Sequence, residues 1–486
     1  MYFNNKAIIG KNENQFLNLE LNMLNRHGII TGATGTGKTI SLKVIAESLS
    51  QAKIPCILTD IKGDLSGCSK EGSSNENLEK RISSLGLENF NFKKFPVRFW
   101  DVFGEKGHPI RVTISDMGPT LLSQIFSLSE AQEGILNIVF KIADDQGLEL
   151  IDLKDLKAIL KYVADHTNEY EMEYGNISST SVSTILRKLL SIENDNGSMF
   201  FGEPNLDIND FMRCSEESGN GYLNIIEAND LVKNPTLYAT FLVLLLSSFY
   251  EKLPEVGDLD KPKAVLFLDE AHLIFSEMNK EVIKKITQII KLIRSKGIGV
   301  FFISQSPADI PNEILNQLGN RVQHCLRAYT PSELKAVKVA ADSFRENDNF
   351  DTEESILELK TGEALISFID TEGQPSIVQR ATILPPQSYM GEISNDEMRQ
   401  IISNGSMEIK YRQVIDRNSA HEKIQEKEKI EEQQEIKEKE NKEKNKNKEK
   451  ESELSKSIKK MTNSAMSSIG RQIGNAIMRG ILGTKK

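Results

Sequence analysis

The sequence predicts an α/β fold with a parallel β-sheet, a large α-helical insertion and a charged C-terminal tail. Three observations support this prediction. Short apolar runs typical of buried strands alternate with amphipathic segments near residues 1–118 and again in residues 256–400. Residues 119–255 show helical periodicity and few strand signals. Residues 421–460 consist mostly of Lys, Glu, Gln and Asn, and such a segment cannot bury a core.

Length and composition limit the classes of protein to consider. A chain of 486 residues exceeds one ordinary hydrophobic core, so we expect two or three structural units. No apolar run reaches the roughly 20 residues of a membrane-spanning helix, and the first residues do not resemble an export signal. The four cysteines, Cys56, Cys68, Cys214 and Cys325, are far apart in the sequence. We therefore expect a cytoplasmic protein with reduced thiols and neither a disulfide framework nor a zinc site.

The charge is distributed unevenly along the chain. The net charge is −10, but residues 421–460 carry a net +1 and residues 461–486 carry four basic and no acidic side chains, so the first 420 residues carry −15. An acidic body is not typical of a free-standing nucleic-acid binder. A function on DNA would need a local basic surface inside a ring or groove.

The first part of the predicted core, residues 1–118, begins with strand-like runs at residues 7–10, 16–21 and 28–31. A glycine-rich loop and an amphipathic helix follow, and Pro55 ends that helix before a buried strand in "CILTDIKGDLSG". The order strand, helix, strand is a βαβ unit, whose strands are parallel. A further strand is expected in "VRFWDVFG".

The predicted insertion, residues 119–255, contains several amphipathic helices and ends with "ATFLVLLLSSFYEKL", which we interpret as a buried core helix. These helices either serve only the structure or form a subdomain that engages a substrate. The sheet resumes in residues 256–400 with "KAVLFLDEAHLIF", a helix, and "VFFISQSPADIP". Pro385 and Pro386 mark the expected edge of the compact domain. Beyond it we expect a charged linker over residues 401–460, as a solvated helix or disordered, and a basic helix over residues 461–486.

The glycine-rich loop matches the pattern G-x-x-x-x-G-K-[ST] between a strand and a helix, which is the context that a phosphate-binding loop requires. Glycines let successive backbone N–H groups point into one concavity, and the helix N-terminus adds partial positive charge. Lys38 is expected to contact the β- and γ-phosphates of ATP, and the Thr39 hydroxyl is suited to Mg²⁺. The expected nucleotide-binding residues are Gly32, Ala33, Thr34, Gly35, Thr36, Gly37, Lys38 and Thr39.

A second motif, "AVLFLDEAH", places Asp269 and Glu270 at the end of an apolar strand. A carboxylate at the tip of a parallel strand beside a phosphate loop is placed to hold Mg²⁺ through water, which we assign to Asp269. Glu270 is expected to act as the general base toward the attacking water. The alternative is that two acidic residues simply end a strand.

A third strand ends in Ser304 and Gln305, and the Gln305 amide is expected to touch the γ-phosphate or the water. Arg294 precedes this strand and is a candidate arginine finger for a neighbouring subunit, with Arg321 and Arg327 as rival candidates. The alternative for Arg294 is a helix C-terminal charge favoured by the dipole.

Two acidic residues of "TDIKGDLSG" complete the candidates, since Asp60 and Asp64 end the second strand near the phosphates. Asp60 either assists metal or water placement or has a structural role.

The long gap between Lys38 and Asp269 indicates an insertion. We also expect one strand to lie between the loop strand and the Asp269 strand, an arrangement found in P-loop ATPases that commonly work as motors.

Several segments together resemble a bacterial family of HerA-like ATPases, the YjgR-type group of the HerA–FtsK superfamily. They include "HGIITGATGTGKTISL", "DIKGDLSG", "FLDEAHLIF", "LIRSKGIGVFFISQSPADIP" and "LGNRVQHCLRAYTPSELKAV", and the resemblance runs from about residue 1 to residue 400. Archaeal HerA proteins carry a β-barrel domain before the ATPase, whereas only about 25 residues precede the loop here. This departure from the archaeal pattern puts in doubt a nuclease-docking role that rests on such a barrel.

The resemblance implies a RecA-like core, a homohexamer and ATP-driven translocation on DNA. It also implies that Lys38 and Thr39 bind phosphate and Mg²⁺, that Asp269 and Glu270 form the Walker B pair, and that Gln305 is the sensor. Arg294 matches the position of the arginine that acts in trans.

We therefore expect an ATP-hydrolysing ring motor that moves DNA or, alternatively, a nucleotide-dependent switch or assembly ATPase that moves nothing. An accessory protein is a possible further partner.

In residues 461–486, Met466, Ile469, Ile473, Ile477 and Ile481 recur at helical spacing beside Arg471 and Arg479. Such a basic amphipathic helix is expected to bind a membrane surface, an acidic partner or the ring itself, or alternatively to dock as an ordinary C-terminal helix.

Overall fold

The computed structural model describes residues 1–3, 6–194, 199–257 and 259–481, with the side chains of residues 194, 443–452 and 468–481 left out. The chain divides into two units, Met1–Ala420 and His421–Lys486. We call the first the compact unit. All four cysteines are free.

One sheet runs through the compact unit. Among the described residues it has thirteen strands, in the order β1-β2-β13-β12-β11-β4-β10-β9-β5-β8-β6-β7, with β3 beside β2. The strands are β1 Tyr2–Phe3, β2 Lys6–Lys11, β3 Phe16–Leu19, β4 Gly28–Thr31, β5 Cys56–Asp60, β6 Val97–Asp101, β7 His108–Pro109, β8 Leu223–Glu227, β9 Ala264–Leu268, β10 Ile298–Ser304, β11 Asn320–Gln323, β12 Glu363–Ser367 and β13 Gln379–Ile383. In the part of the sheet that runs from β11 through β4, β10, β9, β5, β8 and β6 to β7, neighbouring strands are parallel. The pairs β11–β12, β12–β13, β13–β2 and β2–β3 are antiparallel. The predicted α/β fold with a parallel sheet is confirmed.

The strand β10 lies between β4 and β9, as the sequence led us to expect. The register pairs Ser304 with Thr31 on one side and Phe302 with Leu268 on the other. Because the carboxyl ends of parallel strands meet at one edge, the segments that follow β4, β10 and β9 emerge side by side.

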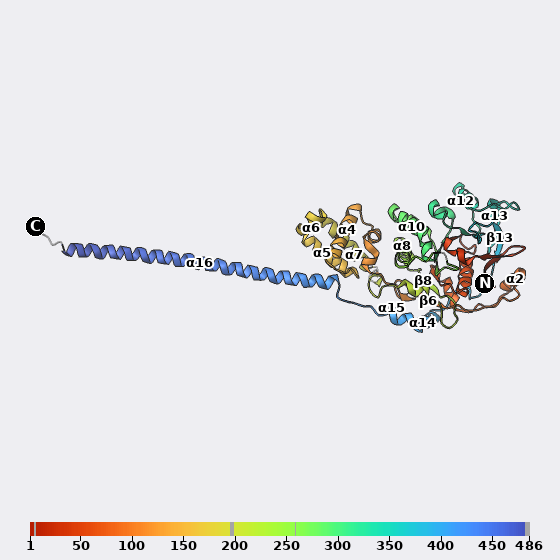
Figure 1. Ribbon diagram of the computed structural model, residues 1–486, viewed down its shortest axis with the longest axis horizontal. Helices are drawn as coiled ribbons and strands as arrows, with labels where there is room; N and C mark the ends of the chain where they lie inside the picture. The colour runs from red at the N-terminus through yellow and green to blue at the C-terminus, as the bar shows by residue number, and fades with distance from the viewer. Residues whose placement is uncertain (4–5, 195–198, 258, 482–486) are drawn as a thin grey trace. The chain divides into compact units, whose positions relative to one another are not determined.

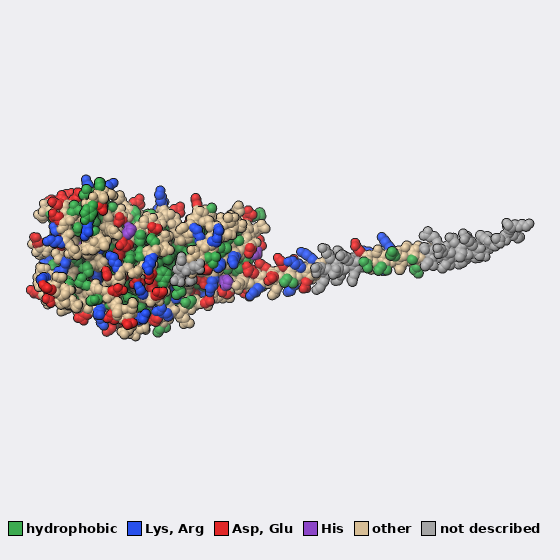
Figure 2. Space-filling view, turned by 180° about the vertical axis from the view of Figure 1, so that it is seen from behind, with side chains coloured by type: hydrophobic (Ala, Val, Ile, Leu, Met, Phe, Trp, Pro, Cys, Tyr) green, Lys and Arg blue, Asp and Glu red, His purple; other side chains and the backbone are tan. Residues whose placement is uncertain are grey.

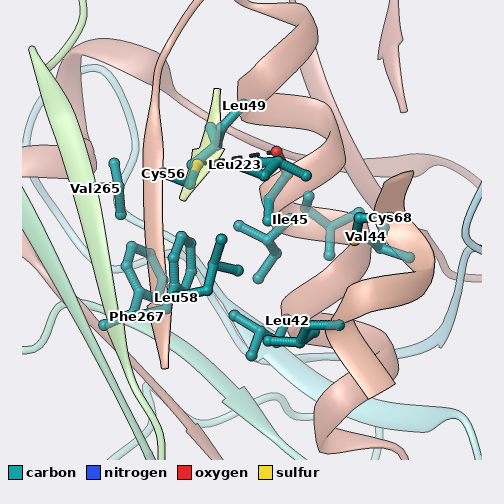
Figure 3. Packing of buried hydrophobic residues seen from close by; sticks show 14 of the residues in the cluster. Leu42, Val44, Ile45, Leu49, Cys56, Leu58, Cys68, Leu223, Val265 and Phe267 are labelled. Atoms are coloured by element: carbon teal, nitrogen blue, oxygen red, sulfur yellow. Dashed lines mark hydrogen bonds between the residues drawn. The ribbon is translucent and has the colours of Figure 1, made fainter. Parts of the chain in front are cut away.

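The helix α1 (Lys38–Gln51) covers the centre of the sheet. Figure 3 shows its side chains facing those of β5, β8 and β9, and the labelled members of this core are Leu42, Val44, Ile45, Leu49, Cys56, Leu58, Cys68, Leu223, Val265 and Phe267. All of them are buried. Burial of the side chains on α1 and on the strands that it covers fixes the start of α1 against the sheet.

The other helices of the compact unit are α2 Glu76–Leu85, α3 Ile114–Ile125, α4 Glu130–Asp145, α5 Leu153–Asp165, α6 Thr167–Tyr174, α7 Ser179–Asn194, α8 Pro235–Lys252, α9 His272–Glu277, α10 Lys280–Leu292, α11 Asn312–Leu315, α12 Pro331–Asp342, α13 Thr352–Glu358, α14 Asn395–Ser403 and α15 Ser406–Tyr411. In Figure 1, α4, α5, α6 and α7 gather into a helical lobe beside the part that contains the sheet. The predicted buried helix is α8, whose apolar side chains are almost all buried.

The prediction that residues 119–255 are a helical insertion was wrong in one respect. β8 lies within this stretch and pairs with β5 and β6 in the parallel part of the sheet. Its residues, "LNIIE", are buried throughout and stand between turn-rich segments. β5 and β9 are equally short but were found because recognisable motifs follow them, whereas no such motif follows β8 and it was grouped with the neighbouring helices.

The compact unit also extends further than predicted. After Pro385 and Pro386 the chain continues through α14 and α15, and Tyr411 in α15 is fully buried. Its ring lies 5.2 Å from that of Trp100. The compact unit therefore ends at Ala420 and not near residue 400.

The described part of the second unit is helical, since α16 runs Ala420–Ile481 and so begins at the last residue of the compact unit. The Lys/Glu-rich segment is thus helical, one of the two states expected for it. Among the residues that the structure describes, no helix is long and apolar enough to span a membrane. The expected amphipathic face of residues 461–486 lies mostly outside the described side chains.

Candidate nucleotide-binding site

The loop of residues 32–37 connects β4 to α1 and has the backbone that its glycines permit. Gly32 has φ 153° and Gly37 has φ 118°, values in the region that favours glycine. A Cβ at Gly32 would lie 2.5 Å from the Cβ of His324, so no larger residue fits there. The Lys38 ammonium donates to the carbonyl oxygens of Gly32 at 2.5 Å and Ala33 at 3.3 Å. Lys38 therefore folds back over the loop.

The loop is held from beneath by the segment that follows β11. The His324 N–H donates to the Thr31 carbonyl at 2.7 Å, and the Ala33 N–H donates to the Cys325 carbonyl at 2.9 Å. On the His324 ring, Nδ1 lies 2.9 Å from the Glu363 carbonyl oxygen and Nε2 lies 2.8 Å from the Ser41 hydroxyl. A carbonyl only accepts, so Nδ1 carries the proton and Nε2 accepts from Ser41. Burial lowers the pKa of His324 to about 4, so the ring is neutral at pH 7.

Asp269 directly follows β9 and is fixed by its neighbours. Its N–H donates to Thr59 Oγ1 at 2.8 Å, and its carbonyl accepts from the Tyr238 hydroxyl at 2.6 Å. Burial and the neighbouring Glu270 raise the pKa of Asp269 to about 6, while Lys62 and Lys38 act in the opposite direction. A buried carboxyl with a raised pKa is stabilised in its charged form by a cation, which suits the predicted role toward Mg²⁺.

Glu270 lies beside Asp269 and has φ 46°, which is uncommon for a residue other than glycine. Its side chain is 23% exposed, and Oε2 lies 3.2 Å from Nδ1 of His272. Burial lowers the pKa of Lys38, and the charges of Glu270 and Asp269 partly offset this effect. The structure therefore brings the lysine of the loop together with both predicted carboxylates.

Gln305 follows β10 and is exposed. It lines a cavity of about 490 Å³ whose other lining residues are Ala33, Thr34, His272, Ser306, Asp309, Leu326, Arg327, Tyr329, Glu333 and Ala336. The predicted sensor thus lies beside the tip of the phosphate loop. The neighbouring Ser304 hydroxyl donates to Asp309 at 2.7 Å, which fixes the turn after the strand.

The three candidate arginines occupy different places. Arg294 lies in the 3₁₀ turn Ile293–Lys296 that precedes β10, so it is at the edge of the sheet opposite the phosphate loop. Arg321 lies on β11 and donates to the carbonyls of Leu318 and Leu315. Arg327 is exposed and lines the cavity beside the loop. Only Arg327 is therefore close to the phosphate loop of its own chain.

The turn after β5 contains Asp60, which accepts backbone N–H groups of Lys62, Gly63 and Leu65. Burial, reinforced by Glu227, raises the pKa of Asp60 to about 7. This pattern is that of a carboxyl that shapes a turn, which is the structural alternative for Asp60. Asp64 begins the following 3₁₀ turn, Asp64–Ser69.

Sequence reasoning missed three residues of this site, Lys62, His272 and His324. Lys62 is exposed, and its charge lowers the pKa of both Lys38 and Asp269, so it lies near the expected phosphates. The lysine within the turn-forming "DIKGD" was a readable signal. His324 gave no signal, because the loop that it supports is distant in sequence. His272 lies two residues after Glu270 and gave none either, because its contact with that carboxylate depends on the local turn.

Comparison with known proteins places this chain in a family. Residues 5–486 match the family described as Helicase HerA-like C-terminal. Two relatives are named DNA double-strand break repair helicase HerA: the Sulfurisphaera tokodaii protein is 24% identical over 78% of this chain and 68% of its own, and the Sulfolobus acidocaldarius protein is 23% identical over 80% and 70%.

Among solved structures, the plasmid coupling protein TrwB in complex with the ATP analogue ADPNP matches with a TM-score of 0.48 and 14% identity over 76% of this chain and 88% of its own. VirB4 of Thermoanaerobacter pseudethanolicus also gives a TM-score of 0.48, with 13% identity over 79% and 97%. With a family match over almost its whole length, this chain belongs to the Helicase HerA-like C-terminal family.

Proposed function

We propose that this protein is a Mg²⁺-dependent ATPase that works as a ring of identical subunits and moves DNA. One observation supports the ATPase activity above all: β4, which leads into the loop, lies two places along the sheet from β9, which ends at Asp269 and Glu270, and the charges of both carboxylates act on Lys38. Binding alone needs the loop, but hydrolysis needs a carboxylate aimed at the γ-phosphate.

The residues of the site fit ATP and Mg²⁺. The loop is open at its tip, since a Cβ at Gly35 would meet nothing within 4 Å. Thr39 and Asp269 supply the oxygen donors that Mg²⁺ prefers. Bound Mg²⁺ would offset the negative charge of the phosphates during hydrolysis.

Hydrolysis then depends on the side chains of this chain. Lys38 neutralises charge on the γ-phosphate, and Glu270 accepts a proton from the attacking water. Gln305, at the end of the strand between them, orients that water or contacts the γ-phosphate. Each of the three side chains comes from a different element, so closing the site depends on the register of β4, β10 and β9.

A ring is proposed from the place of Arg294. It lies across the sheet from its own phosphate loop, a distance of roughly 20 Å for a seven-residue strand. Arg294 can therefore supply charge only to a nucleotide held by another subunit, and we propose that it does so. Arg327, beside its own loop, is the rival for contact with the γ-phosphate.

DNA as the cargo is proposed from the names of the two HerA relatives. Figure 2 shows one face of the compact unit, on which basic and acidic side chains are interspersed without a continuous basic patch. The charge of −15 on the first 420 residues favours the second candidate, a nucleotide-dependent switch or assembly ATPase. We further propose an accessory protein as partner and a cytoplasmic location. We also propose that residues 461–486 contact a membrane surface, and vesicle co-sedimentation with and without these residues tests this contact.

ATP turnover measured with and without DNA tests this proposal. We expect Mg²⁺-dependent turnover, stimulation by double- or single-stranded DNA, and loss of turnover with retained ATP binding in Glu270→Gln. Turnover that no DNA changes at any salt concentration would favour the switch, and unchanged turnover in Glu270→Gln would contradict the base. Imaging of particles with a non-hydrolysable nucleotide tests the ring.

A further inference from the structure

His272 makes a close but imperfect contact with the proposed base. Its Nδ1 lies 3.2 Å from Glu270 Oε2, within the distance of an ion pair. Both atoms are buried, and the contact is not aligned as a hydrogen bond, so neither atom has a hydrogen-bond partner. Buried polar atoms without partners are rare and are often found where a protein performs chemistry.

The backbone explains why Glu270 needs a partner on its side chain. The turn at Glu270 is pinned by the Ala271 N–H, which donates to the Ile303 carbonyl at 3.0 Å. Glu270 itself has a left-handed backbone conformation, with φ 46°. This anchor fixes the Cα, but three side-chain torsions still separate it from the carboxylate. Among the ion pairs found between described residues, the one that includes Glu270 is with His272.

His272 is also the first residue of α9 and lines the cavity beside Ala33, Thr34 and Gln305. The imidazole thus contacts the carboxylate of Glu270 and also borders the space next to the loop tip. From this place it can restrict Glu270 without occupying the space where phosphate binds.

We propose that His272 is a positioning residue that holds the carboxylate of Glu270 for proton abstraction. The inference rests on the proposed function, in which Glu270 is the general base. The Nδ1–H of the imidazole donates to Oε2, and this bond leaves Oε1 to face the attacking water. A carboxylate held by one oxygen keeps the other in place for the reaction.

The chemical step itself balances without His272 changing its protonation. One proton of the water passes to Oε1 of Glu270, and the water oxygen forms a bond to the γ-phosphorus. The bond from that phosphorus to the β–γ bridging oxygen breaks, and the electron pair leaves with ADP. His272 keeps its proton throughout, so its contribution is geometric.

Substitution at His272 tests the proposal through the separation of kcat from KM. We expect His272→Ala to lower kcat for ATP by about 10- to 100-fold, because misplacement of a catalytic group by about 1 Å can cost that much. KM and the affinity for a fluorescent ATP analogue should stay within about twofold. His272→Asn places an amide N–H near the position of Nδ1 and should restore part of kcat. Ser276→Ala, on the exposed face of the same helix, is the matched control and should behave as the wild type.

The outcomes separate this inference from the proposed function. If the wild-type protein hydrolyses ATP and His272→Ala keeps its kcat, the positioning role is wrong while the ATPase assignment stands. A rise in KM at unchanged kcat also overturns the inference, because it would make His272 a binding residue. If the wild-type protein shows no turnover with Mg²⁺, the proposed function fails and this inference with it. Thermal unfolding of each variant shows that the fold is intact, and the His272→Asn variant decides the matter should the alanine variant unfold.

Discussion

The Ser41 hydroxyl on α1 lies 2.8 Å from Nε2 of His324, which follows β11, and this bond joins the helix after the phosphate loop to the strand beside it. Both residues are fully buried. The same imidazole donates from Nδ1 to the Glu363 carbonyl. The ring therefore connects three elements beneath the loop, and the conformation of the loop depends on it.

Removing the Ser41 hydroxyl should destabilise the compact unit. In Ser41→Ala, Nε2 of His324 is left buried without a donor, which costs about 1–3 kcal/mol of the free energy of unfolding. Urea denaturation measures this cost. Ser84→Ala, which removes an exposed hydroxyl on α2, is the control and should change stability by less than about 0.5 kcal/mol. Equal stability of the two variants would contradict the role of the bond.

His324 should also make stability depend on pH in the acid range. Burial lowers its pKa from 6.5 to about 4 in the folded protein, so below pH 6.5 the unfolded chain binds a proton that the folded chain does not. The contribution of His324 is complete above pH 6.5 and is lost as the pH falls toward 4. In His324→Asn this loss is absent, so the stability difference between wild type and variant should shrink by about 2 kcal/mol from pH 7.5 to pH 5.

Comparing two proteins at each pH cancels the other titrating groups. These include His27, whose pKa burial also lowers to about 4, and Asp60, whose pKa burial raises to about 7. Urea denaturation at both pH values gives the required differences. A difference that stays constant would show that His324 is protonated in the folded protein.

Two glycines of the loop should respond differently to the same substitution. A Cβ at Gly32 would lie 2.5 Å from the Cβ of His324 and 2.8 Å from Thr36 Oγ1, whereas a Cβ at Gly35 meets nothing within 4 Å. Gly32→Ala must therefore displace the loop and should weaken binding of an ATP analogue by at least about tenfold, or 1.4 kcal/mol. Gly35→Ala carries only the backbone strain of φ 79°, about 1–2 kcal/mol of stability. Titration calorimetry compares the two, and similar affinities would contradict the steric argument.

Lys62 should assist binding of the phosphates although it lies outside the loop. It is exposed in the turn that Asp60 shapes, and its charge acts on both Lys38 and Asp269. Lys62→Ala should raise KM for ATP about fivefold, equivalent to about 1 kcal/mol for a charge near a protein surface. The effect should diminish in high salt. Lys80→Ala, an exposed lysine on α2 paired with Glu76, is the control, and matching KM values in the two variants would contradict the role of Lys62.

The sequence predicted most of the site because its parts follow local rules. A loop of fixed spacing before a helix and carboxylates at the tip of an apolar strand are visible without a structure, and these rules located Lys38, Asp269 and Glu270. His324 could not be found in this way, because it reaches the loop from β11, far along the chain. The position of Arg294 relative to its own loop likewise depends on the direction of β10 within the sheet.

The fold was predictable where periods are long or a recognisable motif follows a strand, and was missed where an element is short and has no such motif. β8 has only five residues and no motif follows it, so it was grouped with the neighbouring helices. α14 and α15 follow two prolines and have few apolar residues, yet Met398, Ile402 and Tyr411 are buried. The segment after Pro386 is therefore part of the core, although its composition resembles that of a linker.

Truncation at two positions tests where the compact unit ends. The Tyr411 hydroxyl donates to the fully buried Asp210 at 2.7 Å, and Arg111 donates to the Tyr411 carbonyl at 2.7 Å. A chain that ends after residue 420 keeps these contacts, and its unfolding free energy should equal that of the compact unit in the full chain. A chain that ends after residue 400 loses the buried tyrosine and should be less stable by at least about 3 kcal/mol, the cost of removing a large aromatic side chain from a core. Urea denaturation followed by the fluorescence of Trp100, which packs against Tyr411, measures both. Equal stability of the two truncated chains would place the boundary near residue 400, because α15 would then contribute nothing to the core.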